Sequence, residues 1–193
     1  MKENRVMLID ERTNTADMLV QSLKACGYDV IARAKRNDDF LGLCTKLDPD
    51  IIVIDIEKPD QYLMDQLSLV NQSHPKPIVM FSDKGEEEMI QVAVKAGISA
   101  FVVDGLSASR IKPVISVAIA RFKEQLALRN ELKTVKQNLD SRKFTDRAKG
   151  ILMKQKGCSE NDAYAMLRKL AMDRNASISD MAKNIIEVSK LLN

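Results

Sequence analysis

The sequence predicts an α/β fold with a doubly wound parallel sheet of five strands, followed by a helical tail. Short apolar runs alternate with amphipathic segments through the first hundred residues, and beyond residue 106 only helix-period patterns occur. Hydrophobic residues make up 45% of the 193 positions, enough for a substantial core. We therefore expect a folded α/β domain followed by helices.

The expected strands are short and apolar, as strands buried on both faces of a sheet are. They cover residues 5–9, 28–33, 51–54, 77–81 and 100–103. Helix-period segments lie between them, at about residues 14–26, 37–46, 61–73 and 86–96. Five strands interleaved with helices in this way are typical of the flavodoxin-like strand order.

Charge is distributed unevenly along the chain, although the net charge is only +3. Acidic side chains are in excess over residues 1–105, and basic side chains are in excess in the remainder. An acidic domain followed by a basic one that could meet a polyanion is therefore expected. Because no run approaches the ~20 apolar residues that span a bilayer, we expect a cytoplasmic protein without membrane contact.

Polar side chains gather where the expected strands end. In a doubly wound sheet, ligands bind in the crevice beyond the carboxyl ends of the strands. The side chains at these ends are Asp10 and Glu11, Asp55, Ser82 and Asp83, and Asp104. Several carboxylates are therefore expected to crowd one edge of the sheet.

This first segment resembles the receiver domain of two-component response regulators over about 105 residues. The resemblance rests on Asp10, Glu11, Asp55 with Pro59 four residues later, Ser82, and Phe101 in the last strand. It implies that Asp55 is the phosphoacceptor and that Ser82, Phe101 and position 104 form the switch. It also implies a Mg²⁺ ion at Asp10, Glu11 and Asp55, since carboxylates suit this hard cation and Asp55 would act as the nucleophile.

The end of the last strand departs from the receiver pattern. Receivers carry a lysine where this chain has Asp104, and Asp83 adds a second carboxylate beside Ser82. At ~4 Å and an effective dielectric constant near 20, each misplaced charge is worth ~4 kcal/mol before screening. Two interpretations remain: Asp55 is phosphorylated with Mg²⁺ offsetting Asp104, or the pocket is a remnant and a bound partner regulates the domain. We favour the second.

A long helix is expected from residue 107 to about residue 154, because no glycine occurs before Gly150. Its apolar residues fit a heptad and predict a short coiled-coil linker over residues 106–141. The core positions are Ile111, Ala118, Leu132 and Leu139 on one side, and Val114, Leu128 and Val135 on the other. We expect homodimerisation, parallel or antiparallel, with a helix packed within one chain as the alternative.

The remaining residues, 142–193, predict a three-helix bundle. The end of the long helix is followed by a helix that Ser159 opens and by a last helix that Ser177 or Ser179 opens. By their spacing, Met153 and Met166 are expected in the core of this bundle. The bundle carries much of the basic charge.

The tail resembles the ANTAR domain of transcription antitermination regulators over residues 143–192. The matching positions are 148–153, Gly157, Ala163, Leu167, Arg168, Ala171, 179–182, Ile185 and Ile186. The resemblance implies binding to RNA stem-loops in leader transcripts, which keeps a terminator hairpin from forming, with basic side chains neutralising phosphates. The expected RNA-binding residues are Arg147, Ala148, Lys149, Gly150, Arg168, Lys143, Lys154, Lys156 and Lys169.

A receiver-like domain at 1–105, a coiled-coil linker and an ANTAR domain at 142–193 together resemble the AmiR/NasT group of regulators, in particular the nitrate-responsive NasT type. This resemblance implies a non-enzymatic antiterminator that a ligand-sensing protein releases, that dimerises through residues 111–142, and that captures two hairpins. A DNA-binding response regulator is one alternative. A signalling adaptor whose tail binds protein is the other.

Overall fold

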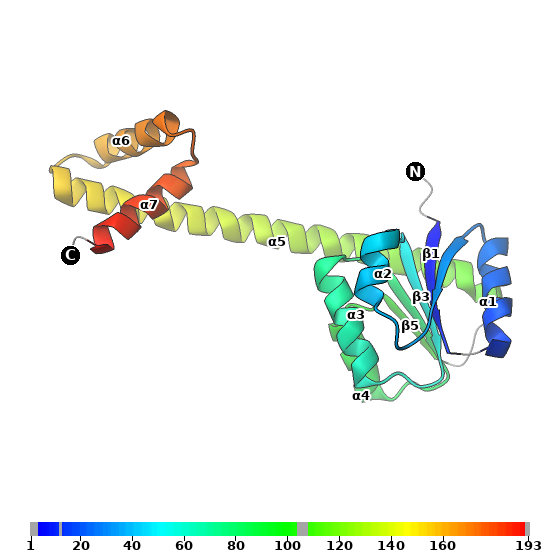
Figure 1. Cartoon of the computed structure of the whole chain (residues 1–193). Coiled ribbons are helices and arrows are strands. Elements are labelled where there is room, and N and C mark those ends of the chain that lie inside the picture. The colour runs from blue at the N-terminus through cyan, green and yellow to red at the C-terminus, as the bar shows by residue number, and fades with distance from the viewer. Residues whose placement is uncertain (1–3, 12, 104–107, 192–193) are drawn as a thin grey trace. The chain divides into compact units, whose positions relative to one another are not determined.

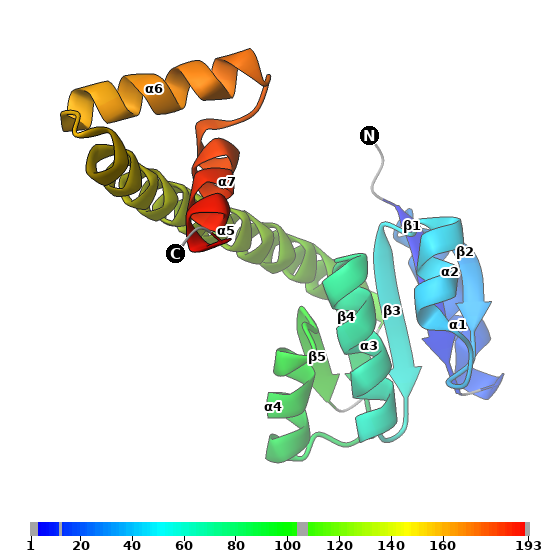
Figure 2. The same ribbon diagram turned by 60° about the vertical axis from the view of Figure 1, so that its left-hand side comes forward.

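The computed structural model describes residues 4–11, 13–103 and 108–191, without the side chains of residues 13–16, 108 and 191. The chain divides into two compact units, Met1–Leu126 and Ala127–Asn193. The first is a sheet flanked by helices, and the second is helical (Figures 1 and 2). No helix in the described residues is both long and apolar enough to cross a membrane.

The first unit contains a five-stranded parallel sheet with the order β2-β1-β3-β4-β5, which confirms the predicted flavodoxin-like fold. Its strands are β1 (Arg5–Asp10), β2 (Asp29–Ala34), β3 (Ile51–Ile56), β4 (Ile78–Ser82) and β5 (Ala100–Val103). The helices between them are α1 (Thr13–Ala25), α2 (Phe40–Leu47), α3 (Gln61–Ser73) and α4 (Glu87–Lys95). Each expected strand and helix is present, with small shifts at its ends.

Both faces of this sheet are covered, which explains why the strands are apolar throughout. Successive side chains of a strand point to opposite faces. Met7 and Ile9 of β1 therefore join the core beneath α2, α3 and α4. Val6 and Leu8 join a second core on the other face, with Leu19 of α1. This is the doubly wound arrangement.

The opening turns of α5 (Ala108–Lys156) complete the second of these cores. Ile111, Ile115 and Ala118 are each 0% exposed and pack with Leu8 and the other side chains of that face. The predicted end of the receiver at residue 105, and the assignment of Ile111 and Ala118 to a coiled coil, are therefore corrected. A helix that covers a sheet buries the same i, i+3, i+4, i+7 positions as a coiled coil does.

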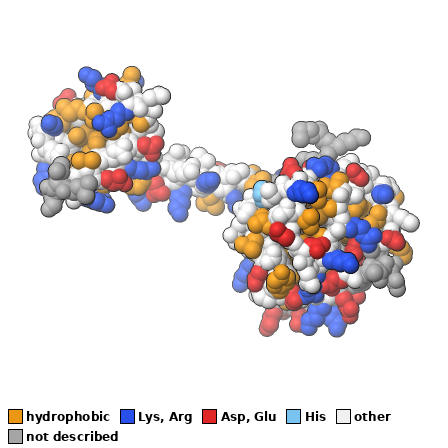
Figure 3. Space-filling model, viewed as in Figure 1, with side chains coloured by type: hydrophobic (Ala, Val, Ile, Leu, Met, Phe, Trp, Pro, Cys, Tyr) orange, Lys and Arg blue, Asp and Glu red, His pale blue; other side chains and the backbone are white. Residues whose placement is uncertain are grey.

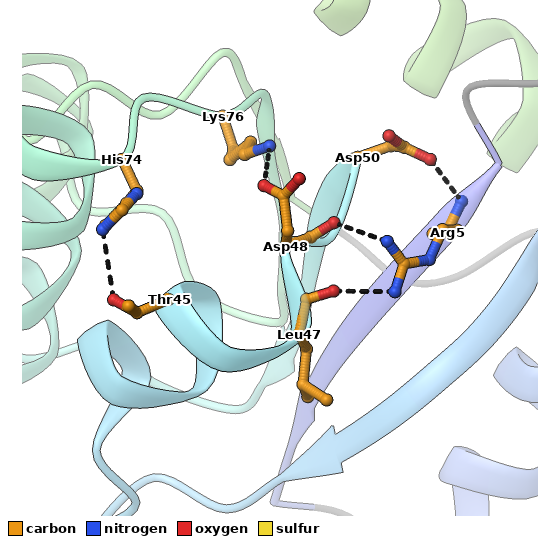
Figure 4. A network of polar contacts seen from close by, with 7 residues as sticks. All are labelled: Arg5, Thr45, Leu47, Asp48, Asp50, His74 and Lys76. Carbon is orange, nitrogen blue, oxygen red and sulfur yellow. Dashed lines mark hydrogen bonds and ion pairs between the residues drawn. The ribbon is translucent and has the colours of Figure 1, made fainter. Parts of the chain in front are cut away.

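A polar network holds the amino-terminal edge of the sheet (Figure 4). Asp10 and Asp55 lie at the opposite, carboxyl ends of β1 and β3. The Arg5 guanidinium donates to the carbonyl oxygens of Leu47 (2.7 Å) and Asp48 (3.0 Å) at the end of α2. Asp48 has φ 44° and closes that helix. The Lys76 ammonium donates to the Asp48 carboxylate at 2.7 Å and holds the pKa of this group below its usual value. This edge is thus fixed by internal contacts.

The second unit packs the end of α5 against α6 (Glu160–Asp173) and α7 (Ile178–Leu191). Its core consists mainly of small and aliphatic side chains: Ala148, Leu152, Ala163, Leu167, Ala171, Met181, Ala182 and Ile186. The alanines allow the helices to approach closely. Met153 and Met166 are 37% and 40% exposed, so their predicted core positions are wrong.

Hydroxyl caps start both short helices of this unit. The Ser159 Oγ accepts a hydrogen bond from the Asp162 N–H (3.2 Å), and the Asp162 carboxylate accepts one from the Ser159 N–H (3.3 Å). This reciprocal capping box satisfies two N–H groups that the helix leaves free. The Ser177 Oγ accepts in the same way from the Asp180 N–H at 3.0 Å, so Ser177 and not Ser179 caps α7.

A matched pair of leucines in α6 tests the packing of this bundle. Replacing Leu167, which is 0% exposed, by alanine should lower the free energy of unfolding by about 2–5 kcal/mol through the cavity that it leaves. Leu170, 36% exposed, provides the control, and Leu170→Ala should cost clearly less. Denaturant unfolding followed by circular dichroism measures both; equal losses would contradict the core described above.

Candidate functional site

The strand register brings the predicted receiver residues to one edge of the sheet. Asp10 of β1 is paired with Asp55 of β3, and Ile56 of β3 with Ser82 of β4. The Glu11 N–H donates to the Asp55 carbonyl at 3.3 Å. Asp55 and Ser82 are each only 2% exposed. We call Asp10, Glu11, Asp55 and Ser82 the acidic edge.

Two arginines pair with the carboxylates of this edge: Arg33 lies near the end of β2, and Arg36 follows that strand. Arg33 Nε donates to Asp10 Oδ2 at 3.1 Å, and the same guanidinium reaches Asp17 at 3.2 Å. Arg36 Nη1 donates to Glu11 Oε1 at 2.7 Å, and its other nitrogen pairs with Asp60. The hydrogen bond to Glu11 is the main cause that raises the pKa of Arg36 above its usual value. Each arginine is shared between two carboxylates, so the charge of the acidic pair is partly offset within the chain.

The arrangement of these carboxylates does not form a metal site. Across residues 4–11, 13–103 and 108–191, no group of three or more His, Cys, Asp or Glu side chains is placed to hold a metal ion. Carboxylates are the right donors for Mg²⁺, but Asp10 and Glu11 are already paired with Arg33 and Arg36. A magnesium ion at Asp10, Glu11 and Asp55 would therefore have to replace the pairs that Arg33 and Arg36 make with Asp10 and Glu11.

The hydroxyl of Ser82 is engaged by the backbone of two loops. Its Oγ lies 2.8 Å from the Lys84 carbonyl oxygen and 3.1 Å from that of Glu57, and it accepts from the Lys84 N–H at 3.2 Å. Phe101 is half-buried against the core and borders a cavity of about 410 Å³ with α4 and α5. The third predicted switch residue, Asp104, lies outside the described residues.

The predicted RNA-binding residues differ in how accessible they are. Ala148 is 0% exposed and packs in the bundle core, so its predicted RNA contact is corrected to a packing role. Gly150 is exposed, and a Cβ added there would meet nothing within 4 Å. The side chains of Lys143, Arg147, Lys154, Lys156, Arg168 and Lys169 are exposed.

Lys149 differs from its basic neighbours because it already has two acidic partners. Its ammonium contacts Asp146 Oδ1 and Glu160 Oε1, each at 2.7 Å, and its side chain is only 16% exposed. The hydrogen bonds to Asp146 and then Glu160 raise the pKa of Lys149. Because Glu160 lies in the first turn of α6, Lys149 links that helix to α5.

Three of the exposed basic residues share one face of α5. Lys143, Arg147 and Lys154 are four and seven residues apart, which places them along one side of a helix with 3.6 residues per turn. No ion pair holds any of the three in the part of the chain that the structure describes. We call them the basic stripe; Gly150 lies between Arg147 and Lys154 on this side.

Apolar side chains are also exposed on the second unit, as the space-filling view shows (Figure 3). On α5 they form a seam at the heptad positions that were expected to lie in a coiled coil. Leu128 is 55%, Leu132 70%, Val135 50% and Leu139 55% exposed. Nothing within the described chain covers this seam.

The sequence reasoning did not find Arg33 and Arg36 as part of the acidic edge. A signal was present, because basic residues after the second strand reach the same edge as the acidic ends of the first and third strands. The pairing also required the strand order, which places β2 beside β1. Sequence spacing alone did not reveal it.

Comparisons with known proteins agree with this architecture. The response regulator receiver domain matches residues 6–116, more than half of the chain, and the ANTAR domain matches residues 133–186. Transcriptional regulatory protein PdtaR of Mycobacterium tuberculosis is 28% identical over 183 residues, which cover 95% of this chain and 89% of that protein. The nitrate regulatory protein of Klebsiella oxytoca is 30% identical over 88 residues, 46% of this chain and 22% of that protein.

Solved structures show the same fold for the first unit. The signal receiver domain of a modulated diguanylate cyclase from Desulfovibrio desulfuricans aligns with a TM-score of 0.55 and 20% identity, covering 63% of this chain and 97% of that one. The sheet order, the acidic ends of its strands and the two matching domains lead to one assignment. The chain belongs to the response regulator receiver family and carries a C-terminal ANTAR domain.

Proposed function

We propose that this response regulator is a transcription antiterminator that binds leader-RNA stem-loops through its ANTAR domain. The observation that carries the proposal is the basic stripe: three exposed basic side chains on one face of α5, none held by an ion pair in the described chain. Such groups gain affinity for a polyanion by releasing its counterions. The role is one of binding and control, without chemical turnover.

The likeness to a nitrate regulatory protein supports a more specific assignment to the nitrate-responsive NasT type. In that assignment, the genes under control serve nitrate assimilation. RNA is favoured over duplex DNA because the ANTAR resemblance concerns stem-loops. A hairpin RNA and a DNA duplex of equal charge, competing for the full chain, distinguish these two partners.

Alanine variants of Arg147 and Lys149 distinguish a side chain that contacts phosphate from one that stabilises the bundle. Arg147→Ala should weaken binding to a hairpin RNA and reduce the slope of log affinity against log salt by about 1, because one phosphate contact is lost. Lys149→Ala should leave that slope nearly unchanged and lower the melting temperature, because its ammonium is already held by Asp146 and Glu160.

Binding measured by fluorescence anisotropy at several salt concentrations gives both slopes. Lys190→Ala, an exposed lysine near the end of α7, is the control for loss of any one positive charge. If Arg147→Ala and Lys190→Ala change the slope equally, the basic stripe has no special part in binding.

Control of the antiterminator is proposed to enter through a regulatory protein that binds the receiver, and not through phosphorylation of Asp55. Arg33 and Arg36 pair with Asp10 and Glu11, the carboxylates that would hold a metal ion. The Ser82 hydroxyl is engaged by backbone groups of Glu57 and Lys84. The chain also has an aspartate at position 104, where receivers carry the lysine that binds the phosphoryl group.

A small-molecule phosphodonor with Mg²⁺ tests this mode of control. Intact-mass measurement of the wild-type chain should find no added phosphoryl group. The triple variant Arg33→Ala/Arg36→Ala/Asp104→Lys should gain a phosphoryl group. The two alanines free the carboxylates of Asp10 and Glu11, and the lysine restores the cation that receivers carry at this position. Adding Asp55→Asn to that variant is the control that removes the acceptor. A phosphoryl group on wild-type Asp55 would overturn the proposal.

The exposed seam is proposed to pair with the seam of a second copy in parallel. In heptad terms, Leu132 and Leu139 occupy one core position and Leu128 and Val135 the other. Arg129 and Lys136 then flank one side of the core, and Glu131 the other. A parallel pair brings Glu131 against Lys136 of the other copy, whereas an antiparallel pair brings the like-charged Arg129 and Lys136 together.

Substitutions on two sides of α5 test this dimer. Leu132→Asp should shift the chain to monomer in sedimentation velocity, because the buried carboxylate would be unpaired. Thr134→Asp adds the same charge on the opposite side of the helix and should leave the dimer intact. Leu139→Cys, in a chain without Cys26 and Cys158, should form an intermolecular disulfide; failure to do so with an intact dimer excludes the parallel arrangement.

A further inference from the structure

A polar groove lies between α5 and the start of α7, outside the predicted RNA-binding residues. Its volume is about 620 Å³, and both ribbon views place the start of α7 beside α5 (Figures 1 and 2). The side chains that line it and matter here are Gln137, Asn138, Ser141, Phe144, Ser179 and Lys183. We call it the amide groove.

The chemistry of the amide groove differs from that of the basic stripe. Gln137 and Asn138 each offer both donors and acceptors, and Ser141 and Ser179 add hydroxyls. The Lys183 ammonium lies 5.5 Å from the centre of the Phe144 ring and pairs with Asp180 at 3.2 Å. A second carboxylate, Asp140, also borders the groove. The groove therefore carries no excess positive charge.

Such a lining suits a flat, uncharged group with hydrogen-bonding edges better than it suits a phosphate. Side-chain amides pair with the edges of bases, carboxylates accept from exocyclic amino groups, and aromatic rings or cations contact base faces. We propose that the amide groove receives an unpaired base of an RNA loop and supplies sequence discrimination. This inference rests on the proposed RNA-binding function and adds a second site to it.

The position of the groove on α5 is compatible with the other two surfaces. At 100° per residue, Gln137, Ser141 and Phe144 lie on the side of the helix opposite the seam residues Leu132 and Leu139. Pairing through the seam leaves this side of the groove open, whereas Asn138, seven residues after Glu131, borders the seam. The basic stripe lies between these two sides, and Lys143 directly precedes Phe144 in sequence. One RNA hairpin can therefore place phosphates on the stripe and a loop base in the groove.

A hairpin enriched by the full chain from an RNA pool with a randomised loop is the probe for this site. Its affinity is compared with that of the same stem carrying a scrambled loop of equal length. Gln137→Ala should reduce the ratio of the two affinities roughly tenfold or more, since the hydrogen bonds between the base and a side-chain amide are lost. The salt slope should not change, because the phosphate contacts remain.

Asn130→Ala is the matched control, because it removes an exposed amide from the same helix outside the groove. An abasic nucleotide at the base that the groove receives should remove the difference between wild type and Gln137→Ala. Asn138→Ala provides a second, exposed position, with sedimentation velocity to check its dimer because Asn138 borders the seam. The test therefore does not depend on Phe144, whose ring packs on the bundle core.

The outcomes separate this inference from the proposed function. If Asn138→Ala and Gln137→Ala keep the same discrimination as Asn130→Ala, or if the pool yields no preferred loop while RNA still binds, the groove does not read a base. If the full chain binds no hairpin at all, the proposed function fails together with the inference. Discrimination lost in the groove variants and kept in Asn130→Ala supports both.

Discussion

A parallel sheet that must be covered on both faces is the constraint on which the rest of this chain depends. One face is covered by α2, α3 and α4, and the other needs α5 in addition to α1. The opening turns of α5 are therefore an obligatory part of the receiver core. The same helix also contributes Ala148 and Leu152 to the core of the second unit. Between these buried ends, its apolar seam has no cover in the described chain.

Internal ion pairs decide which charges remain for a partner. At the acidic edge, Arg33 and Arg36 offset Asp10 and Glu11, so the edge attracts a cation less than its sequence suggests. In the second unit, Asp146 and Glu160 hold Lys149, whereas the basic stripe keeps its charges exposed. Exposed ion pairs contribute little stability, so their main effect here is to position side chains and to set the charge that solvent and partners meet.

The sequence was sufficient where periodicity alone decides the structure. Apolar runs located all five strands, and the positions of Asp10, Asp55 and Ser82 at strand ends follow from a parallel sheet. It was insufficient where one pattern fits two partners: Ile111 and Ala118 have the spacing of a coiled coil but pack on the sheet. Met153 and Met166 are apolar and have the spacing of core residues. Other side chains, many of them alanines, form the core of the second unit, and both methionines are exposed.

Contacts between segments far apart in sequence could also not be predicted from the sequence. The bond of Arg36 to Glu11 and the position of Lys149 against Glu160 depend on which strands and helices are neighbours. The amide groove likewise combines α5 with α7 across about forty residues of chain. Each of these residues was visible as a charge or an amide, but its partner could be named only once the elements were placed.

Gly150 connects the helix geometry of α5 with the proposed binding of RNA at the basic stripe. A glycine inside a helix costs roughly 0.5–1 kcal/mol relative to alanine, and close packing usually explains such a residue. Here a Cβ would meet nothing within 4 Å, so the cost is not offset inside the chain. The residue lies beside Arg147 and Lys154 of the basic stripe, where the missing side chain would let the sugar–phosphate backbone of the proposed RNA partner approach the helix. In the proposed dimer, two such surfaces would gain affinity through effective concentration, without a new contact on either.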